Sequence, residues 1–151
     1  MDSIIIKSPV SNIKLTANNQ YLLKVEFTKD KAVVDTLNPI LIETKNQLGE
    51  YFNGQRKKFT LPIKEEDNSF SAKVYKALRT IKYGETVSYK DIANMVGSPK
   101  AYRAVGNANG DNDLSIIIPC HRVIASDGKL GGYSGGLHIK KYLLHLENKN
   151  K

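Results

Sequence analysis

The chain has 151 residues, 40% of them hydrophobic, which is enough apolar material for a buried core and argues against a disordered protein. Lysine and arginine number 23 against 15 aspartate and glutamate, so the formal charge of +8 favours an anionic partner such as nucleic acid or a membrane surface. The single cysteine, Cys120, excludes an internal disulfide and any CxxC zinc or redox motif.

The first third of the chain predicts a sheet covered by a helix. Apolar runs at residues 4–6, 13–15 and 21–27 predict three strands of an antiparallel sheet. Asn38 followed by Pro39 indicates the cap and first residue of a helix that ends before Gly54. Residues 57–63 are predicted to form a further extended segment.

A polar run at residues 64–68 predicts a linker. We place the domain boundary there, with an N-terminal α/β domain of structural role at residues 1–66 and a DNA-binding and catalytic domain at residues 67–151. The first 72 residues hold 10 basic and 9 acidic side chains, whereas residues 73–151 hold 13 and 6, so the positive charge belongs to the second domain. Surplus lysine can also keep a protein soluble without binding anything. The positive charge therefore indicates nucleic-acid binding only together with a motif.

Helical spacing dominates the second domain. One helix is predicted from Phe70 to Gly84 and another around residues 139–146, with residues 148–151 frayed. No apolar stretch is long enough to cross a bilayer, and residues 1–3 do not resemble the start of a signal peptide. We therefore expect a cytoplasmic protein with no membrane partner.

Two short helices are predicted between these longer ones. Ser88 and Asp91 form a capping-box pattern for a helix that ends at Gly97, with an apolar face made by Ile92, Met95 and Val96. Ser98 and Pro99 then predict the cap and first residue of a second helix. Two short helices joined by a glycine-containing turn indicate a helix-turn-helix.

The second of these helices has side chains suited to DNA. Lys100 and Arg103 can reach phosphates or bases, and the neighbouring small residues Ala104 and Gly106 permit close approach of the backbone. Alanine-rich helices also pack against other helices, so the composition alone leaves both interpretations open.

An apolar run at residues 114–118 leads to Pro119 and Cys120, and two cationic or potentially cationic residues, His121 and Arg122, follow. The thiolate is the reactive form of cysteine, and neighbouring positive charge lowers the pKa of a thiol, so Cys120 is a candidate nucleophile. A lone cysteine after an isoleucine run can instead be a small buried hydrophobic residue. In a strand, moreover, His121 and Cys120 would point to opposite faces.

The run Pro119-Cys120-His121-Arg122-Val123 resembles the PCHRV motif of the O6-alkylguanine-DNA alkyltransferases, also called methylated-DNA–protein-cysteine methyltransferases. The resemblance covers about residues 70–147 and includes Tyr83-Gly84-Glu85-Thr86-Val87-Ser88-Tyr89, Arg103-Ala104-Val105-Gly106, Asn112, the run Gly131-Gly132-Tyr133-Ser134-Gly135-Gly136-Leu137, and Glu147. It implies a mixed α/β (α+β) protein: a ribonuclease H-like N-terminal domain with an antiparallel sheet and a covering helix, and a C-terminal winged helix-turn-helix domain.

The resemblance also implies the chemistry. Cys120 matches the acceptor that takes the alkyl group from O6-alkylguanine, mainly O6-methylguanine, in one irreversible transfer. His121 and Glu147 match the residues that, with a water molecule, remove the thiol proton. Asn112 matches the residue that orients the turn before the cysteine, and Tyr89 matches a tyrosine that contacts the purine and crowds the flipped nucleotide.

Other positions match residues that bind DNA and the base. Arg103, flanked by Ala104 and Gly106 on a helix in the minor groove, matches the arginine that fills the place of the flipped base. Carbonyl groups near Val123 match those that accept the guanine amino group. The loop residues that match the pocket wall and the donors to O6 are Tyr133 and Ser134.

The resemblance implies no metal and no cofactor, double-stranded DNA containing O6-alkylguanine as partner, and a monomer. Asp111 and Asp113 place negative charge near the expected DNA face, and Asn109 stands where relatives commonly have an apolar residue. Two other classes are weighed against alkyl transfer: a helix-turn-helix DNA-binding module in which Cys120 is only packed, and a hydrolase that turns over with Cys120 and His121. A binding module explains neither Glu147 nor the loop, and a hydrolase does not explain the basic helix-turn-helix.

Overall fold

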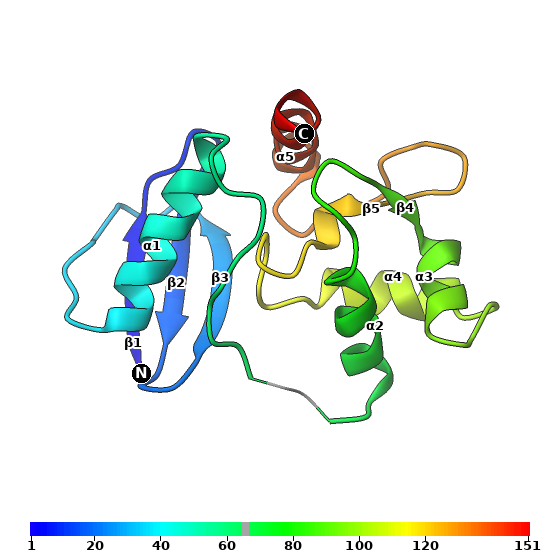
Figure 1. The fold of residues 1–151 in the computed structure, drawn as a ribbon, viewed down its shortest axis with the longest axis horizontal. Helices are drawn as coiled ribbons and strands as arrows, with labels where there is room; N and C mark the ends of the chain where they lie inside the picture. The colour runs from blue at the N-terminus through cyan, green and yellow to red at the C-terminus, as the bar shows by residue number, and fades with distance from the viewer. Residues whose placement is uncertain (65–66) are drawn as a thin grey trace. The chain divides into compact units, whose positions relative to one another are not determined.

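The computed structural model describes residues 1–64 and 67–151, which form two compact units divided between residues 65 and 66 (Figure 1). The predicted linker at residues 64–68 and the predicted boundary after residue 66 both involve residues 65–66, which lie outside the described residues. Within the described part of the chain, no helix is both long and apolar enough to cross a membrane.

The N-terminal unit contains a three-stranded antiparallel sheet in the order β1 (Asp2–Ile6), β2 (Asn12–Ala17) and β3 (Leu22–Thr28). Alternate side chains point into the core because successive residues of a strand face opposite sides of the sheet. In register across the sheet, Ile4 pairs with Leu15, which pairs with Val25, and all three are buried. The three predicted strands are therefore confirmed.

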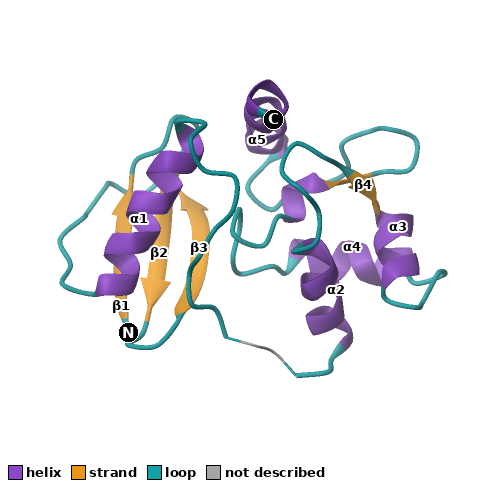
Figure 2. Ribbon diagram, in the orientation of Figure 1, coloured by secondary structure: helices purple, strands orange, loops and turns teal. Residues whose placement is uncertain are grey.

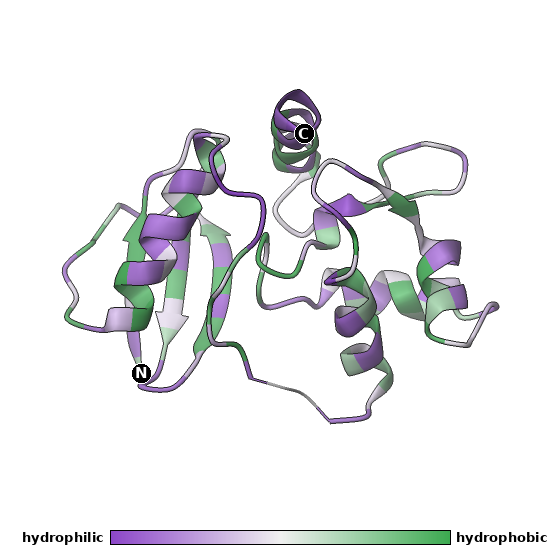
Figure 3. Cartoon of the chain, in the orientation of Figure 1, coloured by the Kyte–Doolittle hydropathy of each residue, from purple (hydrophilic) through white to green (hydrophobic). Residues whose placement is uncertain are grey.

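Helix α1 (Pro39–Phe52) lies against one face of this sheet (Figure 2). The Asn38 side chain accepts hydrogen bonds from the backbone N–H groups of Ile40 and Leu41, which confirms the predicted cap. Leu41 and Leu48 are fully buried, and the alternation of hydrophobic and hydrophilic residues along the helix is visible in Figure 3.

Both edges of the sheet have short additional pairings. Val33 forms a bridge with Ile5 on β1, and Ile63 forms one with Leu22 at the start of β3. Of the predicted extended segment at residues 57–63, Ile63 forms this bridge and the Pro62 carbonyl accepts from the Leu22 N–H, whereas residues 57–58 form a bend.

The C-terminal unit begins with helix α2 (Phe70–Leu78), capped by Ser69. The helix ends six residues before the predicted end at Gly84. Its last turn closes with hydrogen bonds from the N–H groups of Thr80 and Ile81 to carbonyl groups three residues earlier, and the Thr80 hydroxyl also donates to the Ala77 carbonyl. Ile81 is still buried, so the apolar spacing indicated burial and not continued helix.

The predicted helix-turn-helix is formed by α3 (Tyr89–Met95) and α4 (Tyr102–Gly110), which pack against each other and against α2. The capping box of Ser88 and Asp91 is confirmed. Met95 is 52% exposed, so its predicted place on the apolar face is wrong.

The predicted start of α4 at Ser98 and Pro99 is also wrong. The Ser98 N–H donates to Ala93 at the end of α3, and the Ser98 carbonyl accepts from the Ala101 N–H, so these residues form a turn that closes the first helix. Helix α4 begins three residues after Pro99, without a side-chain cap.

A loop leads from α4 to the 3₁₀ turn η1 (Cys120–Arg122) and the short strand β5 (Val123–Ile124). Strand β5 pairs in parallel with β4 (Val87–Ser88), which directly precedes α3. Cys120 therefore does not lie in a strand, and the alternation of faces expected for it and His121 does not apply.

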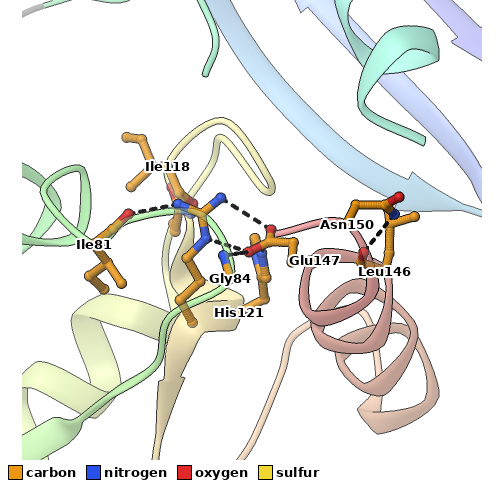
Figure 4. Close-up of polar contacts among 9 residues, drawn as sticks. Ile81, Gly84, Ile118, His121, Leu146, Glu147 and Asn150 are labelled. Carbon is orange, nitrogen blue, oxygen red and sulfur yellow. Dashed lines mark hydrogen bonds and ion pairs between the residues drawn. The ribbon is translucent and has the colours of Figure 1, made fainter. Parts of the chain in front are cut away.

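The last helix, α5 (Leu137–Asn150), packs against η1. Its buried residues are Ile139, Lys140, Leu143, Leu146 and Glu147. The predicted fraying of residues 148–151 is wrong up to Asn150, whose side chain donates to the Leu146 carbonyl one turn earlier (Figure 4).

Candidate active site

Cys120 begins the 3₁₀ turn and is 1% exposed. Its N–H donates to the Ile118 carbonyl, and its own carbonyl accepts from Asn109, so the backbone on both sides of the thiol is fixed. Burial raises the pKa of the Cys120 thiol, while Asn112, the positive charge of Lys140 and Tyr133 act to lower it. The thiol is therefore held neutral at rest and needs a base to become a nucleophile.

His121 is fully buried beside it and forms a 2.6 Å hydrogen bond from Nε2 to Oε2 of Glu147. Burial lowers the pKa of His121, although the carboxylate of Glu147 opposes this effect. Since Glu147 accepts from Nε2, we assign the neutral tautomer that carries its proton on Nε2 and leaves Nδ1 as the acceptor. Nδ1 has no hydrogen-bond partner among the described residues.

Glu147 reaches this turn from α5, 26 residues away in sequence (Figure 4). Besides His121, its carboxylate accepts from the Gly84 N–H and from two nitrogen atoms of Arg122. The hydrogen bonds from His121 and Arg122 and the positive charge of Arg122 hold the pKa of Glu147 far below its ordinary value despite burial. Glu147 is thus ionised at neutral pH, and its carboxylate lies next to the imidazole of His121.

Two asparagines fix the loop before the cysteine. Asn112 donates from its side chain to the Ile118 carbonyl at 2.8 Å and accepts from the Leu114 N–H at 3.0 Å. Asn109 is buried and donates to the Cys120 carbonyl at 3.2 Å. Within the loop, Ile116 has a φ of 73°, which is rare for a β-branched residue. The asparagines hold the chain in a shape that it would not adopt alone.

Lys140 lies buried in α5 and binds three backbone carbonyl groups. Its Nζ donates to Val123 at 2.7 Å, to Gly132 at 3.2 Å and to Leu130. Burial lowers the pKa of Lys140 to about 8, so it is mainly charged at neutral pH. The lysine therefore ties the end of the active-site turn to the loop that follows it.

The loop at residues 125–136 approaches Tyr89, the first residue of α3. Gly131 has a φ of +71°, and a Cβ atom there would lie 2.7 Å from the hydroxyl of Tyr89, so glycine is required. Tyr133 is largely covered near Cys120; burial raises its pKa well above the ordinary value, and the neighbouring Cys120 adds to this. Ser134 is exposed next to it.

The residues of α4 separate into an exposed and a buried group. Arg103 and Ala104 are exposed, whereas Val105 and Ala108 face the core. Gly106 is half-buried and lies next to the ring of Tyr89. A Cβ atom at Gly106 would lie 4.0 Å from the nearest ring carbon atoms, which is an ordinary van der Waals contact. The exposed side of α4 thus presents Arg103 and Ala104 together with Tyr102 and Asn107.

The described residues contain no group of three or more histidine, cysteine, aspartate or glutamate side chains that could hold a metal ion.

Comparison with known proteins agrees with this arrangement. Residues 69–149 match the family model described as 6-O-methylguanine DNA methyltransferase, DNA binding domain, and residues 3–64 match the ribonuclease-like domain of the same proteins. The chain belongs to the 6-O-methylguanine DNA methyltransferase family.

Relatives in this family span the whole chain. The methylated-DNA–protein-cysteine methyltransferase of Methanosarcina barkeri is 46% identical over 97% of this chain and 96% of its own length. The crystal structure of Mycobacterium tuberculosis OGT in complex with DNA is 40% identical, with a TM-score of 0.87 over 97% of this chain and 92% of that chain. An O6-methylguanine DNA methyltransferase from Methanococcus jannaschii is 32% identical, with a TM-score of 0.72 over 97% and 94% of the two chains.

These matches confirm the family resemblance and the mixed α/β fold with a ribonuclease-like and a DNA-binding domain. The structure brings together Cys120, His121, Asn112 and Glu147, and both Tyr133 and Tyr89 lie near Cys120. The carbonyl of Val123 accepts a hydrogen bond from Nζ of Lys140. Arg103, Ala104 and Ser134 contact none of these catalytic groups through any hydrogen bond found in the described residues.

Sequence reasoning missed two buried cations of the site, Arg122 and Lys140. Arg122 was considered only as a neighbouring positive charge that could lower the pKa of the Cys120 thiol, and its contacts with Glu147 and Ile81 were not predicted. The sequence contains a weak sign that Lys140 is buried. Lys140 lies seven residues before Glu147 and therefore on the same face of the helix, and the other buried residues of that face are apolar. A cation on such a face needs partners, which only the folded chain identifies.

Proposed function

We propose that this protein repairs O6-alkylguanine, mainly O6-methylguanine, in double-stranded DNA by transferring the alkyl group irreversibly to Cys120. The observation that carries the proposal is the buried Cys120 thiol next to the His121–Glu147 pair, in a domain that also contains a basic helix-turn-helix. The Cys120 Sγ atom attacks the O6-alkyl carbon, an S–C bond forms, and the C–O bond to guanine breaks. Guanine leaves and the protein keeps a thioether.

His121 acts as the base in this step. Its Nδ1 atom accepts the thiol proton, through a bridging water molecule as in the family pattern, while Nε2 remains bound to Glu147. The depressed pKa of His121 supports this role, because the imidazole is neutral and able to accept a proton at pH 7. The carboxylate then stabilises the imidazolium that forms.

The departing guanine develops negative charge on O6, and Tyr133 and Ser134 supply hydroxyl groups on the loop next to the thiol. The raised pKa of Tyr133 keeps this phenol protonated, so it can donate. The Val123 carbonyl has a second lone pair beyond the one used by Lys140 and is suited to accept from the guanine amino group. The guanine stays in the DNA and takes up one proton from solvent, and His121 gives up the proton that it took from the thiol, so both groups end neutral.

The reacting carbon lies inside a DNA duplex, whereas Cys120 is buried in a folded domain, so the base must be flipped out. Helix α4 supports minor-groove binding, since Arg103 is exposed on it and the neighbouring Ala104 and Gly106 permit close approach of the backbone. Arg103 would fill the space that the base leaves. Affinity would rest on phosphate contacts and fall as salt increases.

The transfer is tested by incubating the protein with a duplex that contains O6-methylguanine and mapping the product by peptide mass spectrometry. We expect one methyl group per protein on the Cys120 peptide, with repair stopping when the protein is used up, and no transfer by Cys120→Ser. Unmodified Cys120 with continued repair would indicate a hydrolase. DNA binding with neither repair nor modification would indicate a binding module.

We also propose that the protein acts as a monomer in the cytoplasm. A one-step transfer by a single thiol needs no second subunit, and the residues of the proposed site all come from the unit that holds α2 to α5. Sedimentation of the free protein at micromolar concentration tests the first point, and a fluorescent fusion tests the second.

A further inference from the structure

Arg122 is buried in η1 next to the two residues that handle the proton, yet the proposed chemistry gives it no role. Its side chain is 7% exposed, and each of its terminal nitrogen groups has a partner. Nε donates to Oε1 of Glu147 at 2.8 Å, Nη2 donates to Oε2 at 3.1 Å, and Nη1 donates to the Ile81 carbonyl at 2.7 Å. The guanidinium therefore grips both carboxylate oxygen atoms in the bidentate geometry that arginine allows and lysine does not.

These contacts leave Glu147 little freedom. Oε1 accepts from Arg122 and from the Gly84 N–H at 3.2 Å, and Oε2 accepts from Arg122 and from His121. The plane of the carboxylate is thus set by the guanidinium, and with it the direction in which Oε2 meets the imidazole. A carboxylate with four donors around it is also a poor proton acceptor.

We infer that Arg122 is a positioning residue that fixes Glu147 as a permanent anion, so that the proton from Cys120 stops on His121 and does not pass on to Glu147. This inference rests on the proposed function. In the balanced step, the S–H bond of Cys120 breaks, His121 gains the proton at Nδ1 and becomes an imidazolium, and Glu147 keeps its charge throughout. Arg122 touches neither the thiol nor the alkyl group in this scheme.

The charges that face His121 come from three parts of the fold. Glu147 and Lys140 face it from α5, Arg122 and Cys120 from its own turn, and Tyr83 lies near Arg122 in the segment before β4, with its ring 5.7 Å from the guanidinium carbon. Glu147 favours the imidazolium, whereas Arg122 and Lys140 disfavour it. Removing the charge of Arg122 should therefore raise the pKa of His121. Removing its two hydrogen bonds to the carboxylate should also leave Glu147 less firmly oriented.

The test compares Arg122→Met, which removes both charge and grip, with Arg122→Lys, which retains the charge. The rate of alkyl transfer from a free O6-alkylguanine base is measured from pH 5 to 9, and the pKa of His121 is measured by NMR in the unreacted proteins. We expect Arg122→Met to react about tenfold more slowly, with both the acid limb of its rate profile and the His121 pKa moved upward by about half a pH unit or more. Arg122→Lys should restore both pH values to those of the wild type.

Arg56→Met is the matched control, since Arg56 also binds a glutamate but lies in the other unit; it should change neither quantity. If Arg122→Met does not fold, Arg122→Gln, which retains a donor for Glu147, carries the same expectation. An unchanged His121 pKa in a folded neutral variant overturns the inference, as does a Lys variant that behaves like Met. The NMR measurement needs no alkyl transfer, so a wild-type protein that fails to methylate Cys120 refutes the proposed function separately.

Discussion

Lys140 and Glu147 lie seven residues apart in α5, which places these two buried and oppositely charged side chains two turns apart on one face of the helix. Lys140 binds carbonyl groups at the end of the active-site turn and in the following loop, and Glu147 binds His121 and Arg122 in the turn itself. A single helix therefore positions both the loop after the active-site turn, through Lys140, and the side chains of His121 and Arg122, through Glu147.

The role of Lys140 is tested by Lys140→Met, which keeps the aliphatic length and removes the charged donor. Three carbonyl groups lose a partner, the buried one of Val123 and the partly buried ones of Leu130 and Gly132. We therefore expect the free energy of unfolding to fall by about 3 kcal/mol and the transfer rate to fall about tenfold. Urea unfolding and single-turnover kinetics give the two values. The neighbouring exposed Lys141→Met should match the wild type in both; equal losses in the two variants would contradict the role of Lys140.

Two glycines of the same loop offer a matched comparison. Gly128 and Gly131 both have positive φ, but only at Gly131 would a Cβ meet Tyr89; none of the described atoms lies within 4 Å of it at Gly128. Gly128→Ala should cost about 1 kcal/mol from backbone strain alone. We expect Gly131→Ala to cost more and to slow transfer about tenfold, because the loop must move away from Tyr89.

The double variant Gly131→Ala with Tyr89→Phe checks the cause. If the tyrosine hydroxyl is what the new methyl group strikes, the double variant should be more stable than the sum of the two single losses predicts. Strict additivity would assign the effect of Gly131 to its backbone alone.

The carboxylate of Glu147 predicts a stability that depends on pH. Its pKa is lowered in the folded protein, so the unfolded chain binds a proton more readily below pH 4.5, and stability is lost as pH falls. Each pH unit in that range contributes about 1.4 kcal/mol for one proton. We expect Glu147→Gln to be less stable overall, since it leaves Arg122 without its anion, but to show a shallower fall between pH 4.5 and 3 in urea titrations. Parallel curves would mean that Glu147 is not the group that titrates.

Arg103 is tested by its substrate dependence. If it fills the gap in the duplex, Arg103→Ala should weaken the repair of O6-methylguanine in duplex DNA about a hundredfold and leave the reaction with a free O6-alkylguanine base near the wild-type rate. Lys149→Ala removes the same charge from an exposed position outside the helix-turn-helix and should affect neither reaction much. Equal losses on both substrates would reject the proposed role of Arg103.

Local chemistry explains which helix ends were predicted correctly. Asn38 with Pro39 and Ser88 with Asp91 marked true starts, because a cap is completed within four residues of sequence. Ser98 with Pro99 has the same signature and failed, since the backbone of Ser98 was already committed to the turn that ends α3. The competing hydrogen bond to Ala93 is local too, but the residue pattern does not show which of two turns will form.

In the candidate site, too, some residues could be predicted from the sequence and others could not. Cys120, His121 and Glu147 were named from the family resemblance, and the folded chain joins His121 to Glu147 by a hydrogen bond. Arg122 binds the Ile81 carbonyl 41 residues away, and Lys140 binds three carbonyl groups that belong to residues of any type. Backbone acceptors carry no residue identity, so no sequence pattern could have named these partners.

The paired edges of the N-terminal sheet have a consequence for repair capacity. An open strand edge can recruit a second molecule and start aggregation, and the bridges from Val33 to Ile5 and from Ile63 to Leu22 occupy part of both edges. If each molecule acts once, the number of lesions that a cell can remove equals its stock of folded, dispersed protein. A domain far from the chemistry in sequence would then set the size of that stock.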